Sequence, residues 1–182
     1  MKKKIWIGIA VLLGLFILFE VYQFATTRSH SPELTETFKS ENLDISVTYC
    51  RPYKKGRLIF GPENEDALVP FGKYWRLGAN DASEITFSKD IMFGGESVKA
   101  GSYRLYAVPN ADSWEVSLNS ELGKFGFFEP DYNLDVAKIK ASVDQKQDIT
   151  EQFTIKFEEN QDKVMMYFLW DQTKVEIPIA YN

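Results

Sequence analysis

The sequence predicts an all-β fold, an antiparallel β-sandwich of the jelly-roll type, preceded by one N-terminal transmembrane helix. Apolar and polar residues alternate with a period of two through most of the chain after residue 42, as expected of half-buried strands. Turn residues separate these segments at intervals of about 8–12 residues, a spacing typical of sandwiches and barrels. An open barrel is the alternative fold.

The N-terminal segment, residues 1–25, is predicted to be a membrane anchor or a signal segment. Three lysines precede fifteen uncharged residues, Ile5 to Phe19. As a helix, residues 5–25 would extend about 31 Å, close to the roughly 30 Å hydrocarbon core of a bilayer. Because basic residues stay on the cytoplasmic side, we expect an inner-membrane anchor with the domain in the periplasm or outside the cell. A cleaved signal peptide, giving a secreted protein, is the alternative.

Residues 26–42 are predicted to be a polar tether between the anchor and the domain. The segment contains Pro32 and has no apolar periodicity. It also contains His30, the one histidine of the chain, which the sequence therefore places in solvent. The folded domain is expected to span residues 43–182.

The strands of this domain are predicted from alternation and from the turn residues between them. Residues 164–170 (VMMYFLW) are apolar on both faces, which predicts a central strand covered on both sides. Turns are expected at Gly94-Gly95, Ala100-Gly101 and residues 171–173. The other predicted strands are 44–50, 84–88, 91–93, 97–99, 102–108, 114–118, 136–143, 153–157 and 175–179.

Charge and composition exclude several classes of protein. Residues 1–28 carry +3, so residues 29–182 carry −8, and an acidic domain is unsuited to nucleic acid. A single cysteine, Cys50, cannot form an internal disulfide, and with one histidine the chain lacks the four Cys or His ligands of a usual zinc site. The sequence thus predicts no metal site and no cofactor, and Cys50 has no histidine partner within the domain.

Residues 51–87 do not follow the alternation and carry the candidate site. Between residues 51 and 76 six cations face three acidic residues, a local balance of +3 within an acidic domain. Aromatic residues are interleaved with these cations, and guanidinium groups beside aromatic rings suit a carboxylate, phosphate or sugar-acid ligand. The predicted ligand-binding residues are Arg51, Arg57, Lys73, Trp75, Arg76 and Asn80.

The same region resembles a bacterial family of secreted or membrane-tethered proteins, the domain of unknown function twenty-nine-eleven. The resemblance rests on a series of spaced motifs. It implies an all-β, extracytoplasmic protein and no catalytic residues; this chain departs from the pattern at residues 63–67 and at Cys50. The matching motifs are Arg51-Pro52, Lys55-Gly56-Arg57, Ile59-Phe60-Gly61, residues 68–73, Trp75-Arg76, residues 78–80, 85–87 and 100–103, Pro109, Trp114, Phe153 and Trp170-Asp171.

These observations favour a non-catalytic module that binds an anionic or carbohydrate ligand, a glycan or a peptide, and that contacts the membrane through residues 5–25. Two alternatives remain open. One is a glycan-cleaving hydrolase that uses a pair of carboxylates, for which Asp81 and Glu84 are the candidates. The other is a scaffold for a membrane partner. The sequence does not indicate an oligomeric state.

Overall fold

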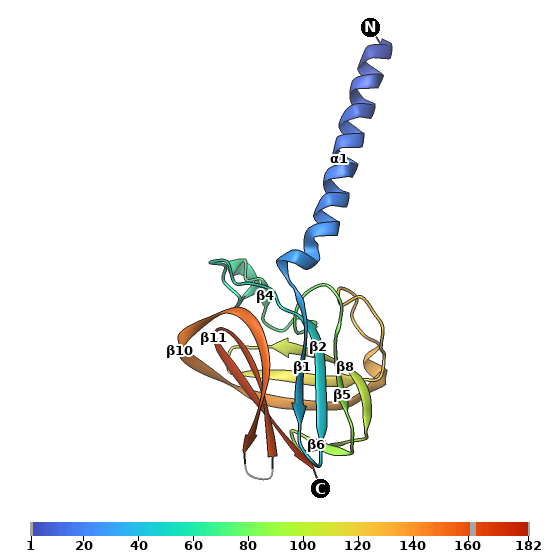
Figure 1. Cartoon of the computed structure of the whole chain (residues 1–182). Coiled ribbons are helices and arrows are strands. Elements are labelled where there is room, and N and C mark those ends of the chain that lie inside the picture. The colour runs from blue at the N-terminus through green and yellow to red at the C-terminus, as the bar shows by residue number, and fades with distance from the viewer. Residues whose placement is uncertain (1, 161–162, 182) are drawn as a thin grey trace.

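The computed structural model describes residues 2–160 and 163–181, which form one long helix and a domain of mostly antiparallel β-strands (Figure 1). This confirms the prediction of a predominantly antiparallel β-protein. The helix, α1 (Lys2–His30), projects away from the domain. It ends at His30, two residues before Pro32, whose ring cannot continue helical hydrogen bonding.

Helix α1 is apolar on all sides. Its described large apolar side chains are exposed, including Trp6 at 70% and Leu12 at 68%. In the part of the chain that the structure describes, however, no helix combines the length and apolar character needed to cross a membrane. The transmembrane part of the fold prediction is therefore not supported.

The structure corrects the prediction that residues 26–42 form a polar tether. The first of these residues complete α1, and β1 (Glu33–Lys39) pairs along its whole length with β2 (Asp44–Cys50). Leu34 and Phe38 are the apolar residues on the core-facing side of β1, where Glu36 also lies, and none of the three is fully buried. An edge strand with two apolar residues is too polar to be recognised from alternation alone.

The remaining strands continue one sheet of nine, in the order β1-β2-β5-β8-β9-β10-β11-β6-β7. Every neighbouring pair in this sheet is antiparallel. The bounds are β5 (Ser83–Phe87), β6 (Ile91–Phe93), β7 (Glu96–Val98), β8 (Gly101–Pro109), β9 (Ser113–Asn119), β10 (Asp135–Asn160) and β11 (Lys163–Tyr181).

Strands β10 and β11 are longer than predicted, because each joins two of the expected strands. Strand β10 changes register twice, between Gln145 and Thr150 and between Thr150 and Thr154, and these irregularities bend it. Asp171 of β11 has a positive φ of 54°, so the residues predicted as a turn are a kink inside a continuous strand.

The bend folds the sheet over an aromatic core, so that strands on either side of β10 face one another (Figure 1). Trp114 of β9 stacks on Phe168 of β11 with ring centroids 6.2 Å apart, and Tyr49 of β2 meets Phe153 of β10 edge-on at 5.5 Å. In β11 the second face is half-buried: Met165, Tyr167 and Leu169 have no further layer over them, contrary to the prediction for this strand.

Two irregular segments cover this sheet. Residues 51–82 lie at the α1 end of the domain and contain β3 (Phe60–Gly61), the 3₁₀ helix η1 (Glu63–Glu65) and β4 (Val69–Pro70), with β3 parallel to β4. Residues 120–134, with the 3₁₀ helix η2 (Tyr132–Leu134), pack over β8 and β9. The fully buried Arg104 joins the two segments, because it donates to the Tyr74 hydroxyl of the first at 2.5 Å and to the Phe128 carbonyl of the second.

The packing of the core predicts that two phenylalanines contribute very differently to the free energy of unfolding. Phe168→Ala removes a fully buried ring and should lower the free energy of unfolding by about 3–5 kcal/mol. The matched control Phe127→Ala removes a ring that is 68% exposed, so a change of about 0.5 kcal/mol or less is expected. Urea unfolding followed by tryptophan fluorescence measures both; equal losses would contradict this packing.

Candidate functional site

A cavity of about 430 Å³ opens at the α1 end of the domain, beneath residues 52–80. One side comes from the end of α1 and the residue after it, and Trp170 of β11 contributes to the opposite wall. The volume lies within the range of small-ligand sites. The lining residues are His30, Ser31, Pro52, Tyr53, Lys55, Arg57, Leu68, Val69, Trp75, Arg76, Gly78, Ala79, Asn80 and Trp170.

The structure brings four of the six predicted site residues into this cavity: Arg57, Trp75, Arg76 and Asn80. No carboxylate and no thiol are among the residues that line it. The cavity therefore gathers positive charge and hydrogen-bond donors from a domain whose overall charge is negative.

Trp75 fixes the position of this segment. Its side chain is 6% exposed, and its ring stacks on Trp170 at 5.8 Å with an interplanar angle of 17°. The indole N–H donates to the Gly78 carbonyl at 3.2 Å, and the Trp75 backbone bridges Ala107 of β8. The residues that follow Trp75 are thus held against the sheet and not left as a free loop.

Arg76 is half-buried in the cavity wall. Its guanidinium donates to the Asn80 carbonyl at 3.4 Å and forms no ion pair with any residue that the structure describes. Burial lowers the pKa of Arg76, and the nearby Arg104 acts in the same direction. Because an arginine keeps its proton in proteins, the wall holds a positive charge that is partly removed from water and has no counter-ion.

Two further donors of the cavity wall lack partners. The side-chain N–H groups of Asn80 and Trp170 are buried and have no hydrogen-bond acceptor among the described residues. Asn80 is 7% exposed and adopts a left-handed backbone, φ 57°. Buried donors are normally satisfied, so each unpartnered group here is an energetic cost that an acceptor in the cavity would relieve.

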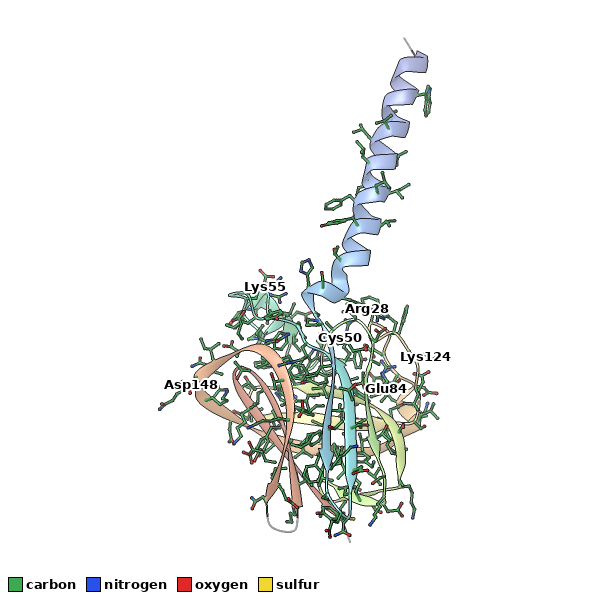
Figure 2. All side chains as sticks on the ribbon, viewed as in Figure 1. Arg28, Cys50, Lys55, Glu84, Lys124 and Asp148 are labelled. Carbon is green, nitrogen blue, oxygen red and sulfur yellow. The ribbon has the colours of Figure 1, made fainter. Side chains whose placement is uncertain are left out.

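The entrance is also basic. Lys55 and Arg57 are exposed, and Figure 2 shows Lys55 at the α1 end of the domain. Arg57 donates to the backbone carbonyls of Lys54 and Tyr53, which holds its stem beside the opening. Lys54 is turned away and pairs with Asp171 at 2.6 Å. Lys55 and Arg57 can attract an anion toward the half-buried Arg76.

The other two predicted site residues lie outside the cavity lining. Arg51 donates to the Phe153 carbonyl at 3.1 Å and to the Thr154 hydroxyl at 2.8 Å, so it fastens the end of β2 to β10. Lys73 lies 3.4 Å from Glu63, and both side chains are more than half exposed. Both residues contribute to the basic cluster in the sequence, but in the structure each contacts other residues of the domain and lies outside the cavity lining.

The predicted carboxylate pair lines a second cavity, of about 270 Å³. Asp81 accepts from Arg28 at the end of α1 at 2.7 Å, and Glu84 accepts from the Gly123 backbone N–H at 2.7 Å. Figure 2 shows Arg28 at the base of the helix and Glu84 on the neighbouring side of the domain. Each carboxylate therefore already has an internal partner.

Cys50 lies next to the first cavity but is closed off by residues 78–81. A Cβ atom on Gly78 would approach the Cys50 carbonyl oxygen to 2.5 Å, so only glycine allows this contact. Burial raises the pKa of the Cys50 thiol, while the Asn80 side chain and the Asp81 backbone N–H favour its ionised form. Nearby Asp81 and Glu33 oppose ionisation.

Sequence reasoning missed several residues of the first cavity. His30 was assigned to a tether, yet it lines the cavity from the end of α1. Trp170 was assigned to a strand core, which is correct, but its indole also borders the cavity. No local pattern reveals either contribution, because both depend on how distant segments pack; Lys55 could have been included from its position between the predicted cations.

A model of one protein family matches residues 31–179, most of the chain. The chain belongs to the DUF2911 family, described as a protein of unknown function. The match begins just before β1 and ends near the end of β11, so it includes the whole lining of the second cavity and all of the first except His30. Neither the curated proteins nor the solved structures include a match to this DUF2911 protein.

The contacts predict different roles for two arginines of this DUF2911 protein. Arg51→Ala removes two hydrogen bonds that join the residue after β2 to β10, and it should lower the free energy of unfolding by about 1–3 kcal/mol. Arg57→Ala removes an exposed side chain bonded only to backbone carbonyls, and we expect a change below about 1 kcal/mol. Urea titration gives both values, and a larger loss for Arg57→Ala would reverse the assignment.

Proposed function

We propose that the DUF2911 domain, a jelly-roll-like β-sandwich, is a non-catalytic module that binds an anionic group of an envelope glycan or peptide in the first cavity. The observation that carries the proposal is Arg76, a half-buried guanidinium with no ion-pair partner among the described residues. A carboxylate or phosphate can accept two hydrogen bonds from one guanidinium, and this pairing is strongest where water is partly excluded.

The two unpartnered N–H donors favour the same ligand class. Asn80 and Trp170 offer donors and the cavity lining offers no carboxylate, so a ligand rich in acceptor oxygens is complementary. The faces of Trp75 and Trp170 are covered by the core. Stacking on a sugar ring is therefore restricted to Tyr53, which is 37% exposed, and the charge of the ligand matters more than its ring.

The absence of acidic side chains from this lining favours binding over catalysis. Hydrolysis of a glycosidic bond normally requires two carboxyl groups on either side of the scissile bond. Asp81 and Glu84 border the second cavity. Asp81 forms an ion pair with Arg28, and Glu84 accepts a hydrogen bond from the Gly123 N–H. We therefore do not advance the hydrolase alternative.

We further propose that α1 attaches the domain to a membrane through residues 5–25, with the domain outside the cytoplasm. Although no described helix is long and apolar enough to cross a bilayer, α1 exposes apolar side chains all around, and such a helix needs an apolar environment. Lys2, Lys3 and Lys4 precede this segment and suit the cytoplasmic side. Secretion after cleavage near residue 25 is the alternative.

Loss of one cavity cation tests ligand binding. In calorimetry with a galacturonic acid oligomer, Arg76→Gln should weaken the affinity by about 10–100-fold, because a charged hydrogen bond contributes about 1.5–3 kcal/mol. Lys73→Gln removes the same charge outside the cavity lining and should have little effect. A neutral N-acetylglucosamine oligomer should not bind. Equal weakening by both variants would show non-specific attraction, and failure of any acidic sugar or acidic peptide to bind would refute the site.

A charge placed on the helix tests attachment. In the full chain, Leu12→Lys with Phe16→Lys should move the protein from the carbonate-resistant membrane fraction to the soluble fraction, because each buried lysine costs about 2.5–3.5 kcal/mol. Phe127→Lys, on the domain, should leave the distribution unchanged. Mass spectrometry of the N-terminus distinguishes the alternatives: a chain that begins near residue 26 indicates cleavage, whereas an intact but soluble wild-type chain contradicts the proposal.

A further inference from the structure

We propose that Glu33, Cys50 and Asp81 form a binding site for a thiophilic divalent cation, with Zn²⁺ as the best match. The Cys50 sulfur and one carboxylate oxygen of each acidic residue all lie within 4.8 Å of one another. In tetrahedral zinc sites the metal lies about 2.3 Å from sulfur and about 2.0–2.2 Å from oxygen, which separates the ligand atoms by roughly 3.3–3.6 Å. Small rotations of the side chains would therefore complete the coordination.

The pairing of β1 with β2 places two of the ligands together. Glu33 stands directly opposite Cys50 in the register, and opposed residues of an antiparallel pair project from the same face of the sheet. Cys50 follows Thr48 on the outer face of β2, yet it is 1% exposed. It is buried because residues 78–81 pass over this outer face and not because it belongs to the aromatic core.

The third ligand is supplied by that covering segment. Gly78 lets the backbone approach Cys50 more closely than any other residue would allow. Leu77 and Asn80, both with left-handed backbones of φ 52° and 57°, then turn the chain so that Asp81 faces Cys50 and Glu33. Non-glycine residues with positive φ are uncommon and persist where the surrounding structure determines them, as it often does at functional sites.

Asn80 provides a second and independent observation. Asn80 directly precedes Asp81 in the segment that covers Cys50. Its side chain is 7% exposed, and its side-chain N–H group has no hydrogen-bond partner among the described residues. An unpaired N–H donor beside the site suits a metal-bound thiolate, because such outer contacts orient and stabilise the ligand.

Charge and access fit a divalent cation. A thiolate and two carboxylates carry three negative charges, and Arg28 contacts only the Oδ2 atom of Asp81 at 2.7 Å, leaving Oδ1 for the metal. The second cavity is lined by Glu33 and Asp81, so a cation can enter from solvent and keep a water molecule as a fourth ligand. Sulfur favours zinc over magnesium or calcium, which prefer oxygen ligands alone.

This site is separate from the proposed ligand cavity. Asn80 borders both, but none of the three metal ligands lines the first cavity. The sequence predicted no metal site because the count considered cysteine and histidine, whereas two of these ligands are carboxylates that tertiary packing brings together. The residues proposed to hold zinc and the cations proposed to hold the anion are different, so separate variants test the two proposals.

The test uses the full chain, purified in detergent and stripped with a chelator, with CoCl₂ and ZnCl₂ as probes. Cobalt bound to a thiolate gives a charge-transfer absorption in the near ultraviolet, which reports Cys50 directly. We expect this band in the wild type and its loss in Cys50→Ser. Calorimetry should show Zn²⁺ affinity reduced at least about tenfold in Glu33→Gln and Asp81→Asn. Glu84→Gln, a carboxylate of the same cavity outside the ligand set, should bind as the wild type does.

Two results overturn the proposal: a wild type without the cobalt band and without heat of zinc binding, or a loss in Glu84→Gln as large as that in Glu33→Gln. Glu33 is exposed, so its variant remains informative if circular dichroism shows that Cys50→Ser does not fold. Asn80→Gly keeps the left-handed backbone and removes the amide. It should shift the cobalt band and weaken zinc binding about tenfold, and an unchanged band would exclude a role for Asn80 in positioning the thiolate.

Discussion

The packing of Trp75 into the aromatic core is the interaction on which the rest of this end of the molecule depends. Its ring lies against Trp114 of β9, Phe153 of β10 and Trp170 of β11. The irregular segment is therefore fixed at one point, and the residues after it have defined positions although they belong to no strand. Without that fixed point, Arg76 would be an ordinary solvated cation.

The sequence predicted the strands because alternation reports which face of a strand is buried, and burial dominates the energetics. Alternation fails where that contrast is weak, as in β1, where Glu36 lies on the core-facing side with the apolar Leu34 and Phe38. It also fails to show continuity: Asp171 resembles a turn residue, yet its left-handed backbone bends β11 without ending it. Pairing with β10 on both sides of the kink, which no local pattern contains, maintains the strand.

The candidate site was predictable as a region but not as a set of contacts. The excess of cations between residues 51 and 76 lies in the segment that lines the first cavity. Whether a given cation is available depends on its partner, and the partner is remote in sequence: Phe153 and Thr154 for Arg51, Asp171 for Lys54. Arg76 differs because it is half-buried and forms no ion pair with a carboxylate of the described residues.

The opposite charges of the two sites follow from one turn of the backbone. Asn80 borders the basic cavity and Asp81 faces Cys50 and Glu33, so consecutive residues separate a cluster of donors from a cluster of acceptors. At the end of α1, Arg28 forms an ion pair with Asp81 of the proposed metal site, and His30 lines the first cavity. A change in the position of the helix end would therefore alter both sites together, because the ion pair with Asp81 and the wall contributed by His30 belong to the same turn of α1.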